Sequence, residues 1–115
     1  MQTLTLRTQA RLWYWQRMSA MVLAGCVVLH IVVIIYAVHS GLSEQAILGR
    51  THRNWFFAGF YSLFVLASAV HVPIGLLRIA EEWLGWRGRS AHVACLVVTL
   101  GLLALGLRAV MGVIL

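Results

Sequence analysis

Charged residues are scarce in this 115-residue chain, and their scarcity limits the class of protein it can be. Only 10% of the residues are charged and 62% are hydrophobic, and neither lysine nor aspartate occurs. A soluble domain carries roughly 25% charged residues, so this chain has too little polar surface to cover a water-soluble core. The composition therefore favours lipid as the solvent.

Motifs for metals and nucleotides are also missing. The two cysteines, Cys26 and Cys95, lie in separate apolar stretches, with no C-x-x-C and no Cys/His cluster of zinc spacing. We interpret both as buried thiols that act as small apolar residues. The chain has no nucleotide-binding fingerprint and no nucleophile next to a base, so we do not expect it to catalyse bond chemistry alone.

Three long apolar runs without formal charge are present instead. They cover residues 18–38, 54–77 and 90–107, and a further apolar tail follows Arg108. About 20 helical residues cross the hydrocarbon core, and backbone groups in lipid must bond within the segment. The sequence therefore predicts an all-α membrane protein with three transmembrane helices in an up-down-up bundle. We expect one domain over residues 1–115, with helices at about 18–39, 54–83 and 90–114.

The net charge of +6 comes from nine arginines and three glutamates. The arginines gather at the ends of the runs: Arg7, Arg11, Arg17, Arg78, Arg87 and Arg89 at one end, and Arg50, Arg53 and Arg108 at the other. The positive-inside rule then predicts a cytoplasmic N-terminus. Basic ends of this kind favour anionic lipid or an acidic protein surface, and we expect no nucleic-acid partner.

The segments outside the runs give weaker signals. Residues 1–17 contain Trp13-Tyr14-Trp15, so we expect this stretch to lie flat at the membrane interface before the first span, with a short amphipathic helix as one form it can take. Residues 40–44 predict a turn into a short non-membrane segment that ends near residues 51–54. Pro73, the only proline, predicts a bend in the second span, either as a packing kink or to shape a cofactor cleft.

A histidine inside the second apolar run is the main functional signal. An ionisable group at that depth is costly and usually functional, and neutral imidazole is a common ligand of haem iron. His71, Gly75, Arg78 and Glu82 follow i, i+4, i+7 and i+11, which is one helical face. We therefore expect His71 to be an axial ligand of haem iron. The alternative is a hydrogen bond from His71 to a neighbouring helix.

The other residues on this face carry further expectations. Gly75 leaves room for a flat ring, Arg78 can meet anionic groups such as haem propionates, and Glu82 and Trp83 lie where a quinone headgroup finds hydrogen-bond partners. Arg17 lies at the same level on the first helix. The alternatives are a snorkelling belt for Arg78 and Glu82, and an interfacial anchor for Trp83.

Four more histidines have to be weighed. His30 lies midway in the first run and can ligate a second haem, support the first, or bond another helix. His92 can contact a quinone or a propionate, whereas His39 and His52 are expected to be solvated. One histidine leaves a haem five-coordinate, so a second ligand comes from another chain, another copy, His30 or His92.

These residues resemble a known family. The segments Arg17-Met18-Ser19-Ala20-Met21-Val22-Leu23, His71-Val72-Pro73-Ile74-Gly75-Leu76-Leu77-Arg78 and Glu82-Trp83 look like the membrane anchors of succinate dehydrogenase and quinol:fumarate reductase. Those anchors have three helices, an arginine before a small hydroxyl residue at the first, and H-x-x-x-G on the second. The resemblance covers nearly the whole chain in length and helix layout.

The resemblance implies a haem b between two anchor subunits, which tether a flavoprotein and an iron–sulfur protein that carry the flavin and the iron–sulfur clusters. It implies that His71 ligates the iron, that Arg17 lies near quinone and propionates, and that Glu82 lies near quinone. The smaller anchor often has Asp-Tyr where this chain has Glu82-Trp83, and an indole can donate a hydrogen bond but cannot accept one. Trp13 replaces a serine of the larger anchor, which favours the smaller one.

The function that the resemblance implies is a haem b-binding anchor that forms part of a quinone-reduction site, without catalytic activity alone. Two alternatives remain: a cytochrome b anchor of another membrane-bound flavin dehydrogenase or reductase, and a purely structural small membrane subunit. We expect a multi-pass protein of the bacterial inner membrane, with the mitochondrial inner membrane as the alternative.

Overall fold

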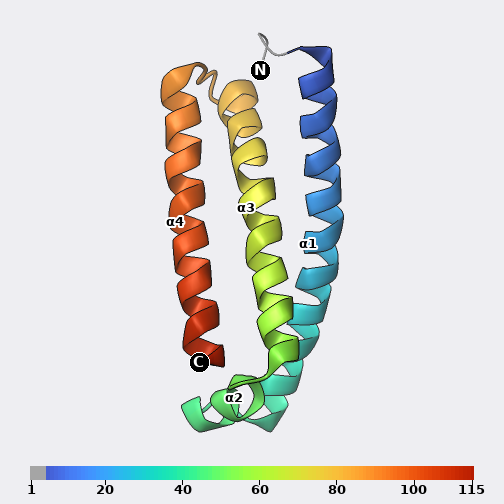
Figure 1. The fold of residues 1–115 in the computed structure, drawn as a ribbon, viewed down its shortest axis with the longest axis vertical. Coiled ribbons are helices and arrows are strands. Elements are labelled where there is room, and N and C mark those ends of the chain that lie inside the picture. Colours follow the sequence, from blue (N-terminus) through green and yellow to red (C-terminus); the bar gives the residue numbers. More distant parts are fainter. Residues whose placement is uncertain (1–4) are drawn as a thin grey trace.

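The fold is a bundle of three long helices with a short helix across one end. The computed structural model describes residues 5–115, and within this range it contains only helices and their connections. They are α1 (Leu6–Ser40), α2 (Glu44–Thr51), α3 (Trp55–Trp83) and α4 (Arg89–Ile114). The three long helices run antiparallel to their neighbours, and α2 lies across the end that holds the C-terminus (Figure 1). The predicted all-α, up-down-up architecture is confirmed.

Local residue choice explains where the first three helices begin. The Thr5 hydroxyl accepts a hydrogen bond from the Thr8 backbone N–H at 3.2 Å, and Ser43 caps α2 in the same way. The Asn54 amide oxygen accepts from the backbone N–H groups of Phe56 and Phe57 at the start of α3. Each side chain satisfies donors that have no partner within the helix.

Helix α1 begins twelve residues earlier than the sequence predicts. Residues 6–17, expected to lie flat at the interface, instead continue along the axis of the first span (Figure 1). This stretch contains no glycine or proline and more than half of it is Leu, Arg and Gln, so nothing in it interrupts a helix. Residues 1–4 of the expected interfacial stretch lie outside the described residues.

The other helices agree with the sequence to within a residue or two. Asn54 is the cap of α3 rather than its first residue, and the expected short non-membrane segment is α2. Pro73 lies inside α3, which is continuous on both sides of it. The turn before α4 places Gly88 at φ 91°, a conformation that a side chain disfavours.

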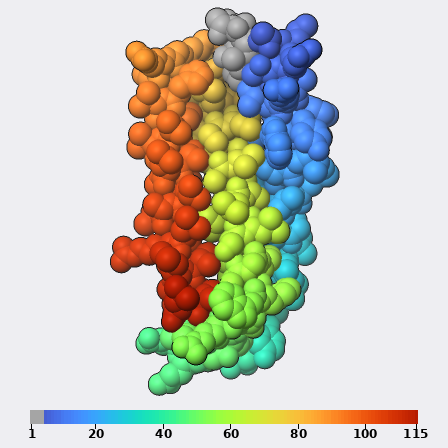
Figure 2. All heavy atoms as spheres, viewed as in Figure 1, coloured from blue at the N-terminus to red at the C-terminus, as the bar shows by residue number. Residues whose placement is uncertain are grey.

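Helix α3 is the centre of the bundle and packs against both α1 and α4 (Figures 1 and 2). The buried residues along these contacts are mostly small: Cys26, Ala67, Ala80, Ala91 and Cys95. Small residues let helices approach closely in lipid, where dispersion contacts drive association. Both cysteines are unpaired and buried, as predicted.

The outer surface of the bundle is apolar. Large exposed side chains occur along all three long helices, including Val28 and Ile35 on α1, Leu66 on α3, and Val97 and Leu105 on α4. Among residues 5–115 no large side chain is fully buried, so the apolar residues do not form a soluble core. The three long helices are each long and apolar enough to cross a membrane. The chain is a multi-pass membrane protein whose lateral surface fits a lipid bilayer.

Candidate functional site at His71

His71 contacts α1 through a single hydrogen bond. Its Nδ1 lies 3.3 Å from the hydroxyl oxygen of Ser19, which is itself buried. The Ser19 hydroxyl also donates to the backbone carbonyl of Gln16 at 3.0 Å. The histidine is therefore joined to the neighbouring helix, as the packing alternative expects, but through only one of its two ring nitrogens.

These two contacts set the choices for the imidazole proton. A serine hydroxyl has one hydrogen, and Ser19 can direct it to the Gln16 carbonyl or to His71. When the hydrogen goes to Gln16, the Ser19 oxygen accepts from His71 and the ring proton lies on Nδ1; when it goes to His71, the ring proton lies on Nε2. In both cases Nδ1 is held by Ser19, and within residues 5–115 Nε2 has no hydrogen-bond partner. The first arrangement is the one in which Nε2 can ligate a metal while the other nitrogen is held by a neighbour.

Gly75 allows α1 and α3 to approach each other one turn from His71. A Cβ atom at this position would lie 3.2 Å from the Gln16 side-chain nitrogen. The space above Gly75, expected to admit a flat ring, is thus filled by the Gln16 amide. A ring that crosses Gly75 has to move this side chain first. The amide oxygen of Gln16 is buried and has no hydrogen-bond partner among the described residues.

An apolar groove of about 260 Å³ adjoins the contact between Ser19 and His71. Ser19 borders it, together with the α1 residues Trp15, Met18 and Val22 and the α3 residues Leu63, Leu66, Ala67 and Val70. His71 itself does not line this groove. Because α1 and α3 are in contact at Gly75, a larger flat group at His71 has to lie outside the contact between these two helices.

Arg78 and Glu82 form a surface pair on α3. Their charged groups are 3.9 Å apart, and the side chains are 45% and 62% exposed. Such pairs are screened by solvent and add little stability, so both groups remain available to a ligand or a partner. Arg78 follows His71 by two turns, which is roughly 10 Å along the helix axis.

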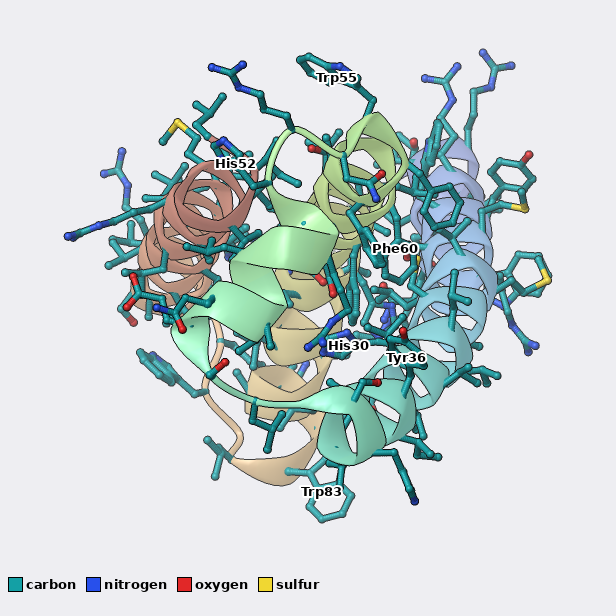
Figure 3. All side chains as sticks on the ribbon, turned by 90° about the horizontal axis from the view of Figure 1, so that it is seen from below. His30, Tyr36, His52, Trp55, Phe60 and Trp83 are labelled. Atoms are coloured by element: carbon teal, nitrogen blue, oxygen red, sulfur yellow. The ribbon has the colours of Figure 1, made fainter. Side chains whose placement is uncertain are left out.

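Arg17 and Trp83 point away from the bundle. The Arg17 guanidinium lies over the Trp13 ring, 5.2 Å from its centroid, and Trp83 is 82% exposed at the end of α3. The Trp83 indole projects outward from the bundle (Figure 3). The structure thus brings His71 and Gly75 together against α1, whereas Arg17, Arg78, Glu82 and Trp83 remain on the surface near the same end.

Three residues of this region were not among the predicted site residues. Ser19 and Gln16 supply the contacts of His71 and Gly75, and Glu81 is buried although its neighbour Glu82 is exposed. The sequence did contain a signal for Ser19 and Gln16. Polar or small residues recur along α1 at spacings of three, seven and four, which places them on one face of the helix: Gln16, Ser19, Cys26 and His30.

The other histidines have different surroundings. His30 lies inside the bundle, where its ring meets the edges of Tyr61 and Phe64 at 5.7 Å (Figure 3). It follows Ser19 by eleven residues, or about 16 Å along α1, so His30 and His71 of one chain cannot ligate the same iron. His92 and His39 are exposed, and each ring nitrogen Nδ1 bonds a carbonyl of its own helix. His52 is exposed as well.

His71 is the side chain of this region that could serve as one axial ligand of a haem, because Ser19 holds its Nδ1 and its Nε2 has no hydrogen-bond partner among residues 5–115. No group of three or more His, Cys, Asp or Glu side chains that could hold a metal ion occurs in the described part of the chain.

Comparison with protein families, characterised proteins and solved structures finds no match to this chain. The resemblance to the anchor family therefore rests on the short motifs and the three-helix layout.

Proposed function

We propose that this protein is a haem b-binding membrane anchor of a succinate dehydrogenase-like complex and forms part of its quinone-reduction site. The observation that supports the proposal is the pair formed by Ser19 and His71, which holds Nδ1 and leaves Nε2 without a partner among residues 5–115. An ionisable side chain inside a membrane span is costly, and a ring held through one nitrogen can ligate iron through the other. Haem, when bound, supplies a reversible one-electron carrier within the membrane.

The roles of the individual residues follow from where they lie. His71 is the axial ligand, and Ser19 holds its ring orientation. Arg78 provides an exposed cation two turns away, suited to a propionate, and Gly75 adjoins the same edge of the site. The second axial ligand comes from outside this chain. His30 is about 16 Å along α1 from Ser19, the partner of His71. The Nδ1 of His92 bonds the Gly88 carbonyl at the start of α4.

Glu82 and Trp83 are suited to a quinone headgroup near the membrane surface. Both are exposed at the end of α3, where an indole N–H can donate to a carbonyl and a carboxylate can accept from a quinol hydroxyl. Arg17 is exposed near the same end of α1 and adds a cation. We place the reduction of quinone at this surface.

The basic end of the bundle is suited to the soluble partner subunits. Six of the nine arginines lie at the end that contains the start of α1, the end of α3 and the start of α4: Arg7, Arg11, Arg17, Arg78, Arg87 and Arg89. By the positive-inside rule this end faces the cytoplasm of a bacterium. The flavoprotein and the iron–sulfur protein would dock here, and a second anchor would cover one of the apolar lateral faces.

The test is the visible spectrum of the purified complex with His71→Ala. We expect loss of the b-type haem absorbance, because His71 is the axial ligand that this chain supplies in the proposal. His39→Ala is the matched control, since His39 is exposed and bonds only its own helix. An unchanged haem spectrum in the His71 variant would refute the ligand assignment. Identification of the co-purifying subunits separates this complex from other flavin dehydrogenases.

A further inference from the structure

Arg108 is the only formally charged residue of α4 beyond its first turn. Its side chain is exposed on the outside of the bundle, and among residues 5–115 it has no hydrogen bond, ion pair or aromatic contact. A guanidinium keeps its charge in proteins and needs several hydrogen-bond acceptors. In the sequence Arg108 follows the third apolar run, so its depth in the membrane depends on how α4 is aligned with α3.

The contact between Gly106 and Val65 fixes that alignment. A Cβ atom on Gly106 would lie 2.9 Å from a methyl carbon of Val65, so the two helices are in close contact at this level. Helix α4 runs antiparallel to α3, and Arg108 follows Gly106 by two residues, which brings it close to the level of Leu63 (Figure 1). Leu63 is near the middle of the uncharged stretch 54–77. Arg108 therefore lies deep in the bundle rather than at its end.

Apolar surface continues beyond the level of Arg108 toward that end of the bundle. His30 on α1 contacts the Phe64 ring close to this level. The exposed apolar side chains that follow it on α1 are Ile31, Val32, Ile34, Ile35 and Val38. Trp55 is exposed at the start of α3 and suits the membrane interface, eight residues or roughly 12 Å beyond Leu63. If the bilayer ended at Arg108, all of these side chains would lie in water, so the base of the Arg108 side chain lies within the hydrocarbon layer.

The direction of the Arg108 side chain also works against contact with water. In an α-helix the bond from Cα to Cβ is tilted toward the N-terminus of the helix, which in α4 leads away from the nearer membrane surface. Charged side chains inside membrane spans are rare, and almost always face protein and pair with another group. Arg108 faces outward from a helix at the edge of the bundle (Figure 1). Its partner therefore has to come from outside this chain.

The small residues beside Arg108 favour a helix as that neighbour. Gly112 and Ala104 lie one turn on either side of Arg108, and Gly101 lies two turns away on the same exposed face. A Cβ atom at Gly101 or Gly112 would meet no atom within 4 Å, whereas one at Gly106 would collide with α3. Packing within this chain thus explains Gly106 but not the other two, and glycine inside a helix is destabilising relative to alanine. Small residues let a second helix approach closely in lipid.

We propose that the outer face of α4 docks a transmembrane helix of a different subunit, and that a carboxylate of this helix pairs with Arg108 inside the membrane. A carboxylate can accept two parallel hydrogen bonds from a guanidinium. A lipid phosphate lies in the headgroup layer, beyond the level of Trp55. A second copy of the chain has no suitable acid, because its carboxylate side chains all lie at the ends of the bundle: Glu44, Glu81 and Glu82.

The proposal does not rest on haem or quinone. Helix α4 makes none of the contacts described for His71, and its outer face lies at the edge of the bundle remote from α1 (Figure 1). The subunit that docks on α4 is therefore recognised by charge and close packing alone.

The test is photocrosslinking in the native membrane with benzoylphenylalanine in place of Leu105, which is exposed three residues before Arg108. We expect an adduct with another membrane subunit, and about tenfold less of it in Arg108→Leu, which leaves packing within the chain intact. Arg108→Lys keeps the charge and should retain most of the adduct. The control is the same probe in place of Ile35 on α1, where Arg108→Leu should change nothing.

Sequencing of the crosslinked peptide identifies the residue that faces Arg108. We expect an Asp or Glu within two helical turns of the crosslinked position. Replacement of that acid by Arg should remove the adduct, and Arg108→Glu in the same complex should restore it. An adduct with phospholipid or with a second copy of this chain would overturn the proposal, as would equal yields with and without the Arg108 charge.

The glycines provide an independent measurement with the same probe. Gly112→Leu places a bulky side chain on the docking face and should lower the yield of the adduct severalfold. Gly25→Leu is the matched control, because a Cβ atom at Gly25 also meets open space but lies on α1. If Gly112→Leu and Gly25→Leu give the same yield, no helix packs closely against this face and the proposal is wrong.

Discussion

The bond between Ser19 and His71 predicts a measurable effect of Ser19→Ala in two assays. Removal of the hydroxyl takes away the hydrogen-bond partner of the His71 Nδ1 and the donor to the Gln16 carbonyl. Hydrogen bonds between membrane helices contribute about 0.6 kcal/mol on average and at most about 1.7 kcal/mol. At 3.3 Å this bond is longer than the usual 2.9–3.0 Å, so its cross-helix contribution belongs near the lower value.

A matched control isolates the contact between the helices. Ser68→Ala also removes a serine hydroxyl, which donates at 2.9 Å to the carbonyl of Phe64 within the same helix. Both variants lose one bond within a helix, but only Ser19→Ala loses a bond to His71. We therefore expect Ser19→Ala to lower the free energy of unfolding by about 0.6 kcal/mol more than Ser68→Ala. Unfolding in mixed micelles with increasing dodecyl sulfate measures the difference.

The second assay is retention of haem by the purified complex. Residues that orient a metal-ligating histidine typically change metal affinity by about 10- to 100-fold when removed. With Ser19 gone, Nδ1 has no fixed partner and the ring can rotate. We expect about tenfold weaker haem binding in Ser19→Ala and none of this loss in Ser68→Ala. If the two variants retain haem equally, Ser19 is only a packing contact and does not orient the ligand.

Two further substitutions test how the helices are held together. Gly75→Leu should force α1 away from α3, because even a Cβ atom would lie 3.2 Å from the Gln16 side-chain nitrogen. We expect the free energy of unfolding in the micelle assay to fall by about 1–3 kcal/mol. Gly75→Ala should be nearly neutral, because the end of the Gln16 side chain can shift to admit one methyl group. Thr51→Val removes the hydrogen bond to the Val113 carbonyl and should speed hydrogen exchange of the α2 backbone amides about tenfold. Thr99→Val loses only a hydrogen bond within α4, so it should leave the exchange of the α2 amides unchanged. Equal exchange of the α2 amides in the two threonine variants would show that the Thr51 hydrogen bond to Val113 does not hold α2 against α4.

Sequence reasoning found the spans because a run of apolar residues is a local property. The caps at Asn54 and Ser43 are also local signals, since a cap acts on the residues that follow it, but Asn54 was predicted as the first helical residue and not as a cap. The early start of α1 was missed because Trp13 and its aromatic neighbours indicate membrane depth, which does not determine backbone conformation. Residues 6–17 have ordinary helix-forming composition, and that local preference determines their structure.

The candidate site, in contrast, depends on contacts between helices, which the sequence does not reveal. His71 stands out in the sequence because an ionisable group in lipid is costly wherever it lies on the helix. Its partner Ser19 could not be chosen in the same way, because their contact depends on the register of two antiparallel helices. Gly75 illustrates the same point, since the sequence predicts space there, but only the packing of α1 puts Gln16 in it.

His30 and His71 show that residue type and membrane burial do not by themselves determine the chemistry of a histidine. Both lie on the interface between α1 and α3, yet the Nδ1 of one is held by a hydroxyl and the Nδ1 of the other is enclosed without a partner. The Ser19 contact orients the His71 ring through one nitrogen and leaves Nε2 without a partner among the described residues, whereas the His30 ring lies against the edges of Tyr61 and Phe64. The atoms that surround each ring, rather than its depth in the membrane, therefore decide which nitrogen is available to a ligand.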